Sequence, residues 1–314
     1  MLGPLRFEVF LPFYAFQNVK PCSLFSCLKE VVLEAERLGY DAVWLDDHLM
    51  FDGARVLECW TALSALASVT RRVRLGTMVT SVGFRNPALL AKMAATVDLI
   101  SGGRLNFGVG AGVQRDEHVA FGFSFPELSV RVERLREAVE IVKKLWTEEK
   151  VSYRGRHFSV VDAVCEPKPL QRPHPPVTIG GCGETYTLRV TAQLADRFDF
   201  GYLPSVELYR RKLRVLERYC AEFGRSVGEF EVSCWPAGQI FVAEDEGALA
   251  EKILRCKPSG VSLGDFAASS LFCTVDECRR SLQVYVDLGV KRFVLFFGDL
   301  PDLSSLRLFA GSFA

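Results

Sequence analysis

The chain has 314 residues, of which 49% are hydrophobic and 24% charged, a composition that fits a folded globular protein and excludes a disordered or fibrous one. Its 38 lysines and arginines balance 38 aspartates and glutamates, so the basic excess of a dedicated nucleic-acid binder is missing. A chain of this length buries roughly three quarters of its unfolded surface without a metal or disulfide staple. We therefore expect a small-molecule partner, no nucleic acid and no membrane.

The ten cysteines and the N-terminus bear on the compartment. The cysteines include no C-x-x-C pair and none at zinc-ligand spacing from a histidine, so no metal site is predicted. Such residues are typical of buried thiols in a reducing compartment, although the sequence leaves open whether any of them form disulfides. The N-terminus lacks the pattern of a signal peptide, and no run approaches the roughly 18 apolar residues of a membrane span. The sequence predicts a cytoplasmic protein.

Short apolar runs alternate with helical patterns along the first half of the chain. Gly39 is placed to end one helix and Pro87 to begin another. Each run is rich in residues that favour strands, and each helical pattern has apolar residues at a spacing of three to four. The predicted strands are 6–11, 41–45, 73–80 and 104–109, and the predicted helices are 24–38, 57–70, 87–100 and 129–148.

The alternation is interrupted once and then resumes. A hairpin is predicted over 151–161, followed by a proline-rich stretch over 166–176. Residues 257–274 have no clear pattern and are predicted to be a loop at the barrel mouth. The later strands are predicted at 177–179, 199–203, 230–242 and 292–297, and the helices at 184–194, 207–223, 245–255 and 275–288. Eight strands in alternation with helices predict an α/β fold, a (β/α)8 TIM barrel with an insertion after the fourth β/α unit, as a single domain over 1–314.

Catalytic groups of such barrels come from the C-terminal ends of the strands. His48, one of only four histidines, follows the second predicted strand, and Asp47 beside it is placed to fix its tautomer. The alternative is a histidine that only packs or caps at the strand end, and the sequence does not decide between them. Phe13 and Tyr14 follow the first strand and are candidate substrate contacts.

Two glycine clusters follow neighbouring strands. Gly108, Gly110 and Gly112 surround the end of the fourth strand, and a cluster without Cβ atoms lets a flat ring approach the backbone. The run 180–183 opens a helix and is placed to offer backbone N–H groups to a phosphate. Each cluster taken alone is more often a tight turn. Together they indicate a planar cofactor with a phosphate tail.

At these residues the sequence resembles the luciferase-like flavin- and deazaflavin-dependent oxidoreductases. The resemblance covers most of residues 7–200 and fades toward the C-terminus. It is carried by the segments AERLGYDAVWLDDHL (35–49), RVRLGTMVTSVGFRNPALLAKMAATVDLISGGRLNFGVGAG (72–112), the E-x-x-A-F-G of 117–122, and PPVTIGGCGETYTLRVTAQLAD (175–196). The pattern is most similar to the branch of coenzyme F420-dependent methylenetetrahydromethanopterin reductase and F420-dependent dehydrogenases.

The resemblance implies that the barrel mouth holds coenzyme F420, a deazaflavin, with FMN as the alternative. It implies a non-proline cis peptide bond at Met78 and Val79 behind the ring, and a role for His48 and Asp47 near the reacting carbon. The cofactor-binding residues that it implies are Met78, Val79, Thr80, Gly110, Ala111, Gly112, Gln114, Gly180, Gly181, Cys182 and Gly183.

One departure from the family bears on the substrate. Sugar-phosphate and alcohol dehydrogenases of this family place a glutamate just after the glycine loop as a proton donor, whereas this chain has Val113. We therefore expect hydride transfer with a small organic substrate, C=N or C=C rather than a sugar phosphate. Alternatives are an FMN-dependent monooxygenase, a cofactor-binding barrel without catalysis, and an aldolase-type barrel, although no lysine stands at a predicted strand end to form a Schiff base.

The resemblance also implies a homodimer. Relatives often associate through the helices beside the second and third strands, and the apolar segment 57–69 is suited to such an interface.

Overall fold

The computed structural model describes residues 5–51 and 53–313. Within them, eight parallel strands form a closed barrel, because the sheet order that starts at β3 and reaches β5 is closed by the pairing of β3 with β5. The prediction of a (β/α)8 barrel is confirmed. The barrel strands are, in spatial order, β1 (Arg6–Leu11), β2 (Ala42–Leu45), β3 (Arg74–Thr77) with its continuation β4 (Thr80–Ser81), β5 (Leu105–Gly110), β8 (Val177–Gly180), β9 (Arg197–Asp199), β10 (Glu231–Cys234) and β13 (Arg292–Leu295).

Helices cover the outside of the barrel. Local signals set their ends as expected: Gly39 ends the first helix with a left-handed φ of 87°, and Asn86 caps the third, with Pro87 at its first position. The covering helices are α1 (Leu24–Leu38), α2 (Cys59–Val69), α3 (Pro87–Ser101), α5 (Leu128–Thr147), α6 (Thr187–Leu194), α7 (Val206–Glu222), α10 (Val275–Val286) and α11 (Ser304–Phe313). The short helix α4 (Arg115–Ala120) and the last helix, α11, were not predicted from the sequence.

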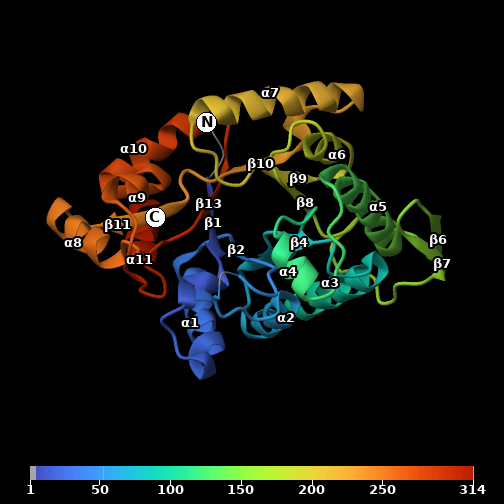
Figure 1. Cartoon of the computed structure of the whole chain (residues 1–314), viewed down its shortest axis with the longest axis horizontal. Coiled ribbons are helices and arrows are strands. Elements are labelled where there is room, and N and C mark those ends of the chain that lie inside the picture. Colours follow the sequence, from blue (N-terminus) through green and yellow to red (C-terminus); the bar gives the residue numbers. More distant parts are fainter. Residues whose placement is uncertain (1–4, 52, 314) are drawn as a thin grey trace.

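Two excursions leave the barrel at opposite ends of the molecule's long axis (Figure 1). The first is the predicted hairpin, β6 (Val151–Arg154) and β7 (Ser159–Ala163), and it follows α5 as expected. The second comprises β11 (Gln239–Ala243), α8 (Glu246–Cys256), α9 (Leu263–Ser269) and β12 (Ser270–Thr274), with β11 and β12 paired in parallel.

The second excursion corrects two predictions. The single strand expected over 230–242 is wrong, because the chain leaves the barrel at Trp235 and Pro236 and returns to strand geometry only in β11. The loop expected over 257–274 is also wrong, since it contains α9 and β12. The rings of Phe241, Phe266 and Phe272 pack against each other. The strands of this region are joined to the main core through Ile240, Val242 and Cys273.

Two barrel strands differ from their predicted bounds. The third is interrupted between Thr77 and Thr80, and the Met78–Val79 peptide bond there is cis, as the resemblance implies. The sixth strand was predicted at 199–203, but β9 spans Arg197–Asp199, and Gly201 follows it with a left-handed φ of 71°. Asp199 is therefore the last residue of a strand rather than the first, which places it at the barrel mouth.

The barrel has a large core outside and a small one inside. The outer core lies between strands and helices and contains the fully buried rings of Trp60, Phe107 and Trp146. The inner cluster contains Phe10, Ala42, Trp44, Val294 and Phe296. These inner rings fill the middle of the barrel, so space for a ligand is left only at its ends.

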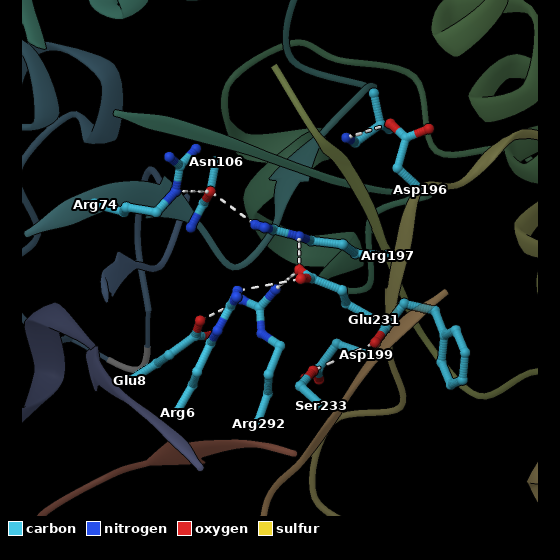
Figure 2. A network of polar contacts seen from close by, with 12 residues as sticks. Arg6, Glu8, Arg74, Asn106, Asp196, Arg197, Asp199, Glu231, Ser233 and Arg292 are labelled. Atoms are coloured by element: carbon cyan, nitrogen blue, oxygen red, sulfur yellow. Dashed lines mark hydrogen bonds and ion pairs between the residues drawn. The ribbon is translucent and has the colours of Figure 1, made fainter. Parts of the chain in front are cut away.

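Charged side chains close the N-terminal end of the barrel (Figure 2). Arg197 Nε and Arg292 Nη1 each lie 2.6 Å from the same Glu231 oxygen, and Arg292 also contacts Glu8. Arg74 Nε and Arg197 Nη1 both donate to Asn106 Oδ1, at 2.7 and 2.8 Å. Because this network occupies the N-terminal end, the C-terminal mouth is where the barrel can open to a ligand.

Each of the ten cysteines is a free thiol. Across residues 5–51 and 53–313, none of the helices combines the length and the apolar character needed to span a bilayer, and the same residues hold no cluster of potential metal ligands.

Candidate functional site

A cavity of about 490 Å³ opens at the C-terminal ends of the strands, within the usual size range of ligand pockets. Its wall includes nine of the residues expected at the site from the sequence, namely Asp47, His48, Met78, Val79, Gly110, Ala111, Gly112, Gly180 and Gly181. The remaining lining residues are Ser81, Val113, Glu117, Leu128, Thr187, Asp199, Phe200, Gly201 and Trp235. The two glycine clusters and the histidine of the second strand therefore meet at one place.

Six expected site residues do not line this cavity: Phe13, Tyr14, Thr80, Gln114, Cys182 and Gly183. The expectation for Phe13 is wrong because its ring is fully buried in the outer core. Thr80 is also fully buried, and its hydroxyl accepts a hydrogen bond from Trp60 Nε1 at 3.0 Å. Tyr14 stacks on Phe51, with ring centroids 5.0 Å apart.

The hydrogen-bond partner of His48 is Glu117. His48 Nδ1 lies 3.0 Å from Glu117 Oε1, and the other carboxylate oxygen accepts backbone N–H groups of Leu49 and Met50, at 3.1 and 3.5 Å. The Glu117 side chain is 3% exposed. A carboxylate only accepts, so it favours the tautomer with the proton on Nδ1 and leaves Nε2 free to exchange a proton. Glu117 has the role that the sequence analysis gave to Asp47.

Asp47 forms an ion pair instead. Its two oxygens accept from Arg85 Nη1 and Nη2, at 2.6 and 3.0 Å, and Arg85 also contacts Glu58, which caps α2. The Asp47 side chain is fully buried in this pair. The expectation that Asp47 fixes the histidine tautomer is therefore wrong. Asp47 ties the end of β2 to the segment before α3.

The glycines at the ends of β5 and β8 make room for Val79. A Cβ on Gly110 would lie 2.6 Å from Val79 Cγ2, and one on Gly180 would lie 2.7 Å from Val79 Cγ1. From the sequence these glycines were expected to contact a ligand, whereas their first effect is to accommodate the Val79 side chain. Val79 lines the cavity, so it provides an apolar surface on which a flat ring can rest.

The second glycine cluster differs from the expectation in one respect. The Gly181 N–H donates to the carbonyl of Asp199, so it is not available to a phosphate. The N-terminus of α6 has no side-chain cap, and its first residue, Thr187, lines the cavity, while the next N–H, that of Leu188, donates to the Gly183 carbonyl. An anion at this edge would meet the helix start rather than Gly181.

Asp199 and Trp235 are site residues that the sequence analysis missed. The Asp199 oxygens accept from the backbone of Gly201, at 2.7 Å, and from the Ser233 hydroxyl, while burial raises the pKa of this carboxyl. Asp199 was missed because its strand was predicted two residues too late, and Trp235 because it was placed inside a long strand. For Glu117 a signal existed, since it begins the E-x-x-A-F-G segment that carries the resemblance.

Apart from His48, the ionisable side chains that line the described cavity wall are carboxylic acids. Among the described residues that line it there are three carboxylates, each engaged by partners inside the protein, and neither lysine nor arginine. The remaining surface is mostly apolar, and Val113 at the mouth is 76% exposed. This wall is suited to an uncharged, largely apolar group.

Asp46, the residue directly before Asp47, has a buried carboxyl that makes the stability of the fold depend on pH. Burial raises the pKa of its carboxyl from 3.8 to about 6, and only one of its oxygens has a partner, the backbone N–H of Phe13 at 3.0 Å. Because the folded-state pKa lies above the unfolded one, folding favours the protonated form, and that stabilisation is lost as pH rises from about 4 to about 6.

We expect Asp46→Asn to reduce this pH dependence, because the amide stays neutral. Between pH 4 and pH 7, the free energy of unfolding of the wild type should fall by up to roughly 3 kcal/mol relative to that of Asp46→Asn. Urea unfolding at several pH values measures this difference. Asp116→Asn, an exposed change of the same kind, should follow the wild type. Parallel curves for wild type and Asp46→Asn would contradict the expected role of burial.

A (β/α)8 barrel with its cavity at the C-terminal mouth belongs to the architecture of barrel enzymes. Comparison with known proteins identifies the family within this architecture. The family described as "Luciferase-like monooxygenase" matches residues 5–263, and the chain belongs to this luciferase-like family. It is 38% identical over 304 residues to a protein of Microbacterium testaceum named F420-dependent glucose-6-phosphate dehydrogenase, covering 88% of each chain.

A second relative and two solved structures are also similar to this chain. A protein of the same name from Segniliparus rotundus is 34% identical over 311 residues, covering 90% of this chain and 91% of the other. Among solved structures, an F420-dependent secondary alcohol dehydrogenase in complex with an F420–acetone adduct has a TM-score of 0.80 at 21% identity, covering 98% of both chains. A monooxygenase of Streptomyces bottropensis has a TM-score of 0.79 at 26% identity, also covering 98% of both.

Proposed function

We propose that this protein is an oxidoreductase that transfers a hydride between coenzyme F420 and a small organic substrate. The observation that carries the proposal is the cavity at the barrel mouth, where Val79 lies between Gly110 and Gly180 and His48 faces the same space. Relatives that match about nine tenths of the chain bear names of F420-dependent enzymes, which supports this cofactor.

The residues of the cavity fit such a group. Met78, Val79 and the glycines of 110–112 offer a flat, largely apolar surface for the ring. The start of α6, next to Gly180, would hold the phosphate, with Cys182 and Gly183 as nearby backbone donors. When bound, the deazaflavin supplies two-electron hydride chemistry, and the protein supplies orientation and exclusion of water.

His48 is the acid–base candidate. Its Nδ1 is hydrogen-bonded to Glu117. Nε2 is therefore the atom that would donate a proton to the substrate, or accept one from it, during hydride transfer. Val113 stands where sugar-phosphate and alcohol dehydrogenases of the family place a glutamate, so this chain offers no second acid at that position. Asp47 supports the site through Arg85 and makes no direct contact that fixes His48.

We propose a substrate without a phosphate, reduced at a C=N or C=C bond. Relatives are named for glucose 6-phosphate, a dianion that proteins bind with arginine and lysine. The described cavity wall lacks both, and the start of α6 would already be occupied by the phosphate of the cofactor. An uncharged or cationic, largely apolar substrate fits this wall better.

A binding titration tests the cofactor. Purified protein should bind F420 tightly and FMN weakly, as measured by fluorescence quenching of each cofactor. Reduced F420 should be oxidised by members of a panel of imines and activated alkenes, while glucose 6-phosphate should give no turnover. Tight FMN binding without F420 binding would refute the proposal in favour of an FMN-dependent monooxygenase. Tight F420 binding with no turnover across the panel would favour a carrier.

Two further predictions from the sequence, a homodimer and a cytoplasmic location, stay predictions. Helix α2, one of the helices expected at the dimer interface, buries most of its apolar residues inside its own chain, including Trp60, Leu63 and Leu66. Among the large apolar side chains of these two helices, Val69 of α2 is 41% exposed, and Leu89 and Ile100 of α3 are 56% and 46% exposed. We propose that a second copy would contact α3 more than α2.

A further inference from the structure

A second side-chain pair, Ser81 and His118, lies beside the pair of His48 and Glu117. Ser81 is the last residue of β4, and it lines the cavity. Its Oγ lies 3.1 Å from His118 Nε2. His118 is 1% exposed and directly follows Glu117 in α4, so one short helix provides the partners of two cavity residues.

The protonation of the His118 ring nitrogens follows from its contacts. Nδ1 lies 2.6 Å from the carbonyl oxygen of Gln114, which can only accept, so Nδ1 carries a proton. In the neutral ring Nε2 is then an acceptor, and the Ser81 hydroxyl donates to it. The rings of Phe84 and Phe125, with centroids 4.3 and 4.9 Å away, hold the imidazole in place. The Ser81 proton is thus directed away from the cavity.

This arrangement leaves one acceptor position on Ser81. A serine hydroxyl has one donor and two lone pairs. The donor is used by His118, and one lone pair accepts the backbone N–H of Gly83 at 3.3 Å. Space near Ser81 is also limited, since a Cβ on Gly112 would lie 2.7 Å from its oxygen. The second lone pair is the one remaining for a bound molecule.

We propose that His118 is a positioning residue that holds the Ser81 oxygen as a hydrogen-bond acceptor for an N–H or O–H donor of the bound cofactor ring. The inference rests on the proposed function, because it requires a cofactor ring with such a donor in the cavity. His118 acts only through Ser81, because the ring of His118 lies behind Ser81 and does not line the cavity.

A double-mutant cycle on cofactor binding tests this inference. Ser81→Ala and His118→Phe should each raise the Kd for F420 about three- to tenfold, the effect of one hydrogen bond. The double variant should bind as weakly as either single one, because His118 acts through Ser81. Ser81→Thr, which keeps the hydroxyl, should recover most of the affinity. Ser68→Ala and His157→Phe make the same chemical changes on α2 and at the first hairpin, and should leave Kd unchanged.

The outcomes separate this inference from the proposed function. Thermal unfolding of each variant establishes that it is folded before its Kd is used. If the wild type binds F420 and Ser81→Ala binds equally well, or if the two effects add, the inference is wrong while the proposed function stands. If the wild type binds only FMN, the F420 proposal is wrong, and the same cycle measured with FMN decides the inference, since a flavin ring also carries an N–H. Binding of neither cofactor overturns both.

Discussion

Replacing His48 with alanine should lower kcat by roughly 10²- to 10⁴-fold, the usual contribution of a positioned general acid or base. The imidazole lines the cavity, and its Nδ1 is held by Glu117, so Nε2 is the group available to the substrate. Steady-state turnover of reduced F420 with a substrate from the panel measures the effect. Kd for F420 should change far less than kcat, because in the proposed function the ring would rest mainly on Val79 and the glycines.

Glu117→Gln tests whether Glu117 sets the tautomer of His48. The amide is nearly the same size, but its NH2 group would donate to Nδ1 and move the proton to Nε2. We expect a loss of kcat close to that of His48→Ala, and little further loss in the double variant, since both act on the same proton. His157→Ala is the matched control, because this histidine also pairs with a glutamate, Glu133 at 2.9 Å, but on the outer hairpin. Unchanged kcat in His48→Ala would exclude it as the acid–base group.

The strand-end rule explains why much of the site could be predicted from the sequence. His48 follows the second predicted strand, and the glycine cluster of 108–112 lies at the end of the fourth. Because the strands of such a barrel are parallel, their C-terminal ends meet at the same mouth, so both groups were expected there. The partner of His48 could not be found in this way. Glu117 lies on α4, a helix of six residues, which is too short to leave a periodic pattern.

The errors in the fold have local physical causes. Phe200, Tyr202 and Leu203 have the composition of a strand, but Gly201 takes a left-handed conformation that ends β9 earlier, and Asp199 consequently moved from a strand start to the cavity wall. Asp47 was expected to contact His48 because the two residues are consecutive in the sequence. Consecutive residues near a strand end point in different directions, and Asp47 faces Arg85, 38 positions away, instead.

Gly108→Ala should have the largest effect on stability. A Cβ at this position would lie 1.8 Å from the carbonyl oxygen of Thr77, a backbone atom that cannot rotate away, because both residues belong to barrel strands. The Thr77 hydroxyl also donates to the Gly108 carbonyl at 2.7 Å, so the two strands cannot separate without losing this bond. We expect the free energy of unfolding to fall by at least about 3 kcal/mol, measured by urea unfolding. Gly311→Ala is the control: nothing lies within 4 Å of its Cβ position in α11, and alanine there should stabilise the helix slightly.

A second variant tests the same packing if Gly108→Ala does not fold. In Gly110→Ala the clash is with Val79 Cγ2, at 2.6 Å, which is a side chain and can be removed. Gly110→Ala should be destabilising by itself, and adding Val79→Ala should restore part of the loss, a coupling that independent sites would not show. Additive losses would contradict the view that the glycine ends of β5 and β8 accommodate Val79. Coupled losses would mean that these glycines first accommodate Val79, between β3 and β4, and shape the ligand surface only through it. Cofactor affinity should then recover less in the double variant than stability does.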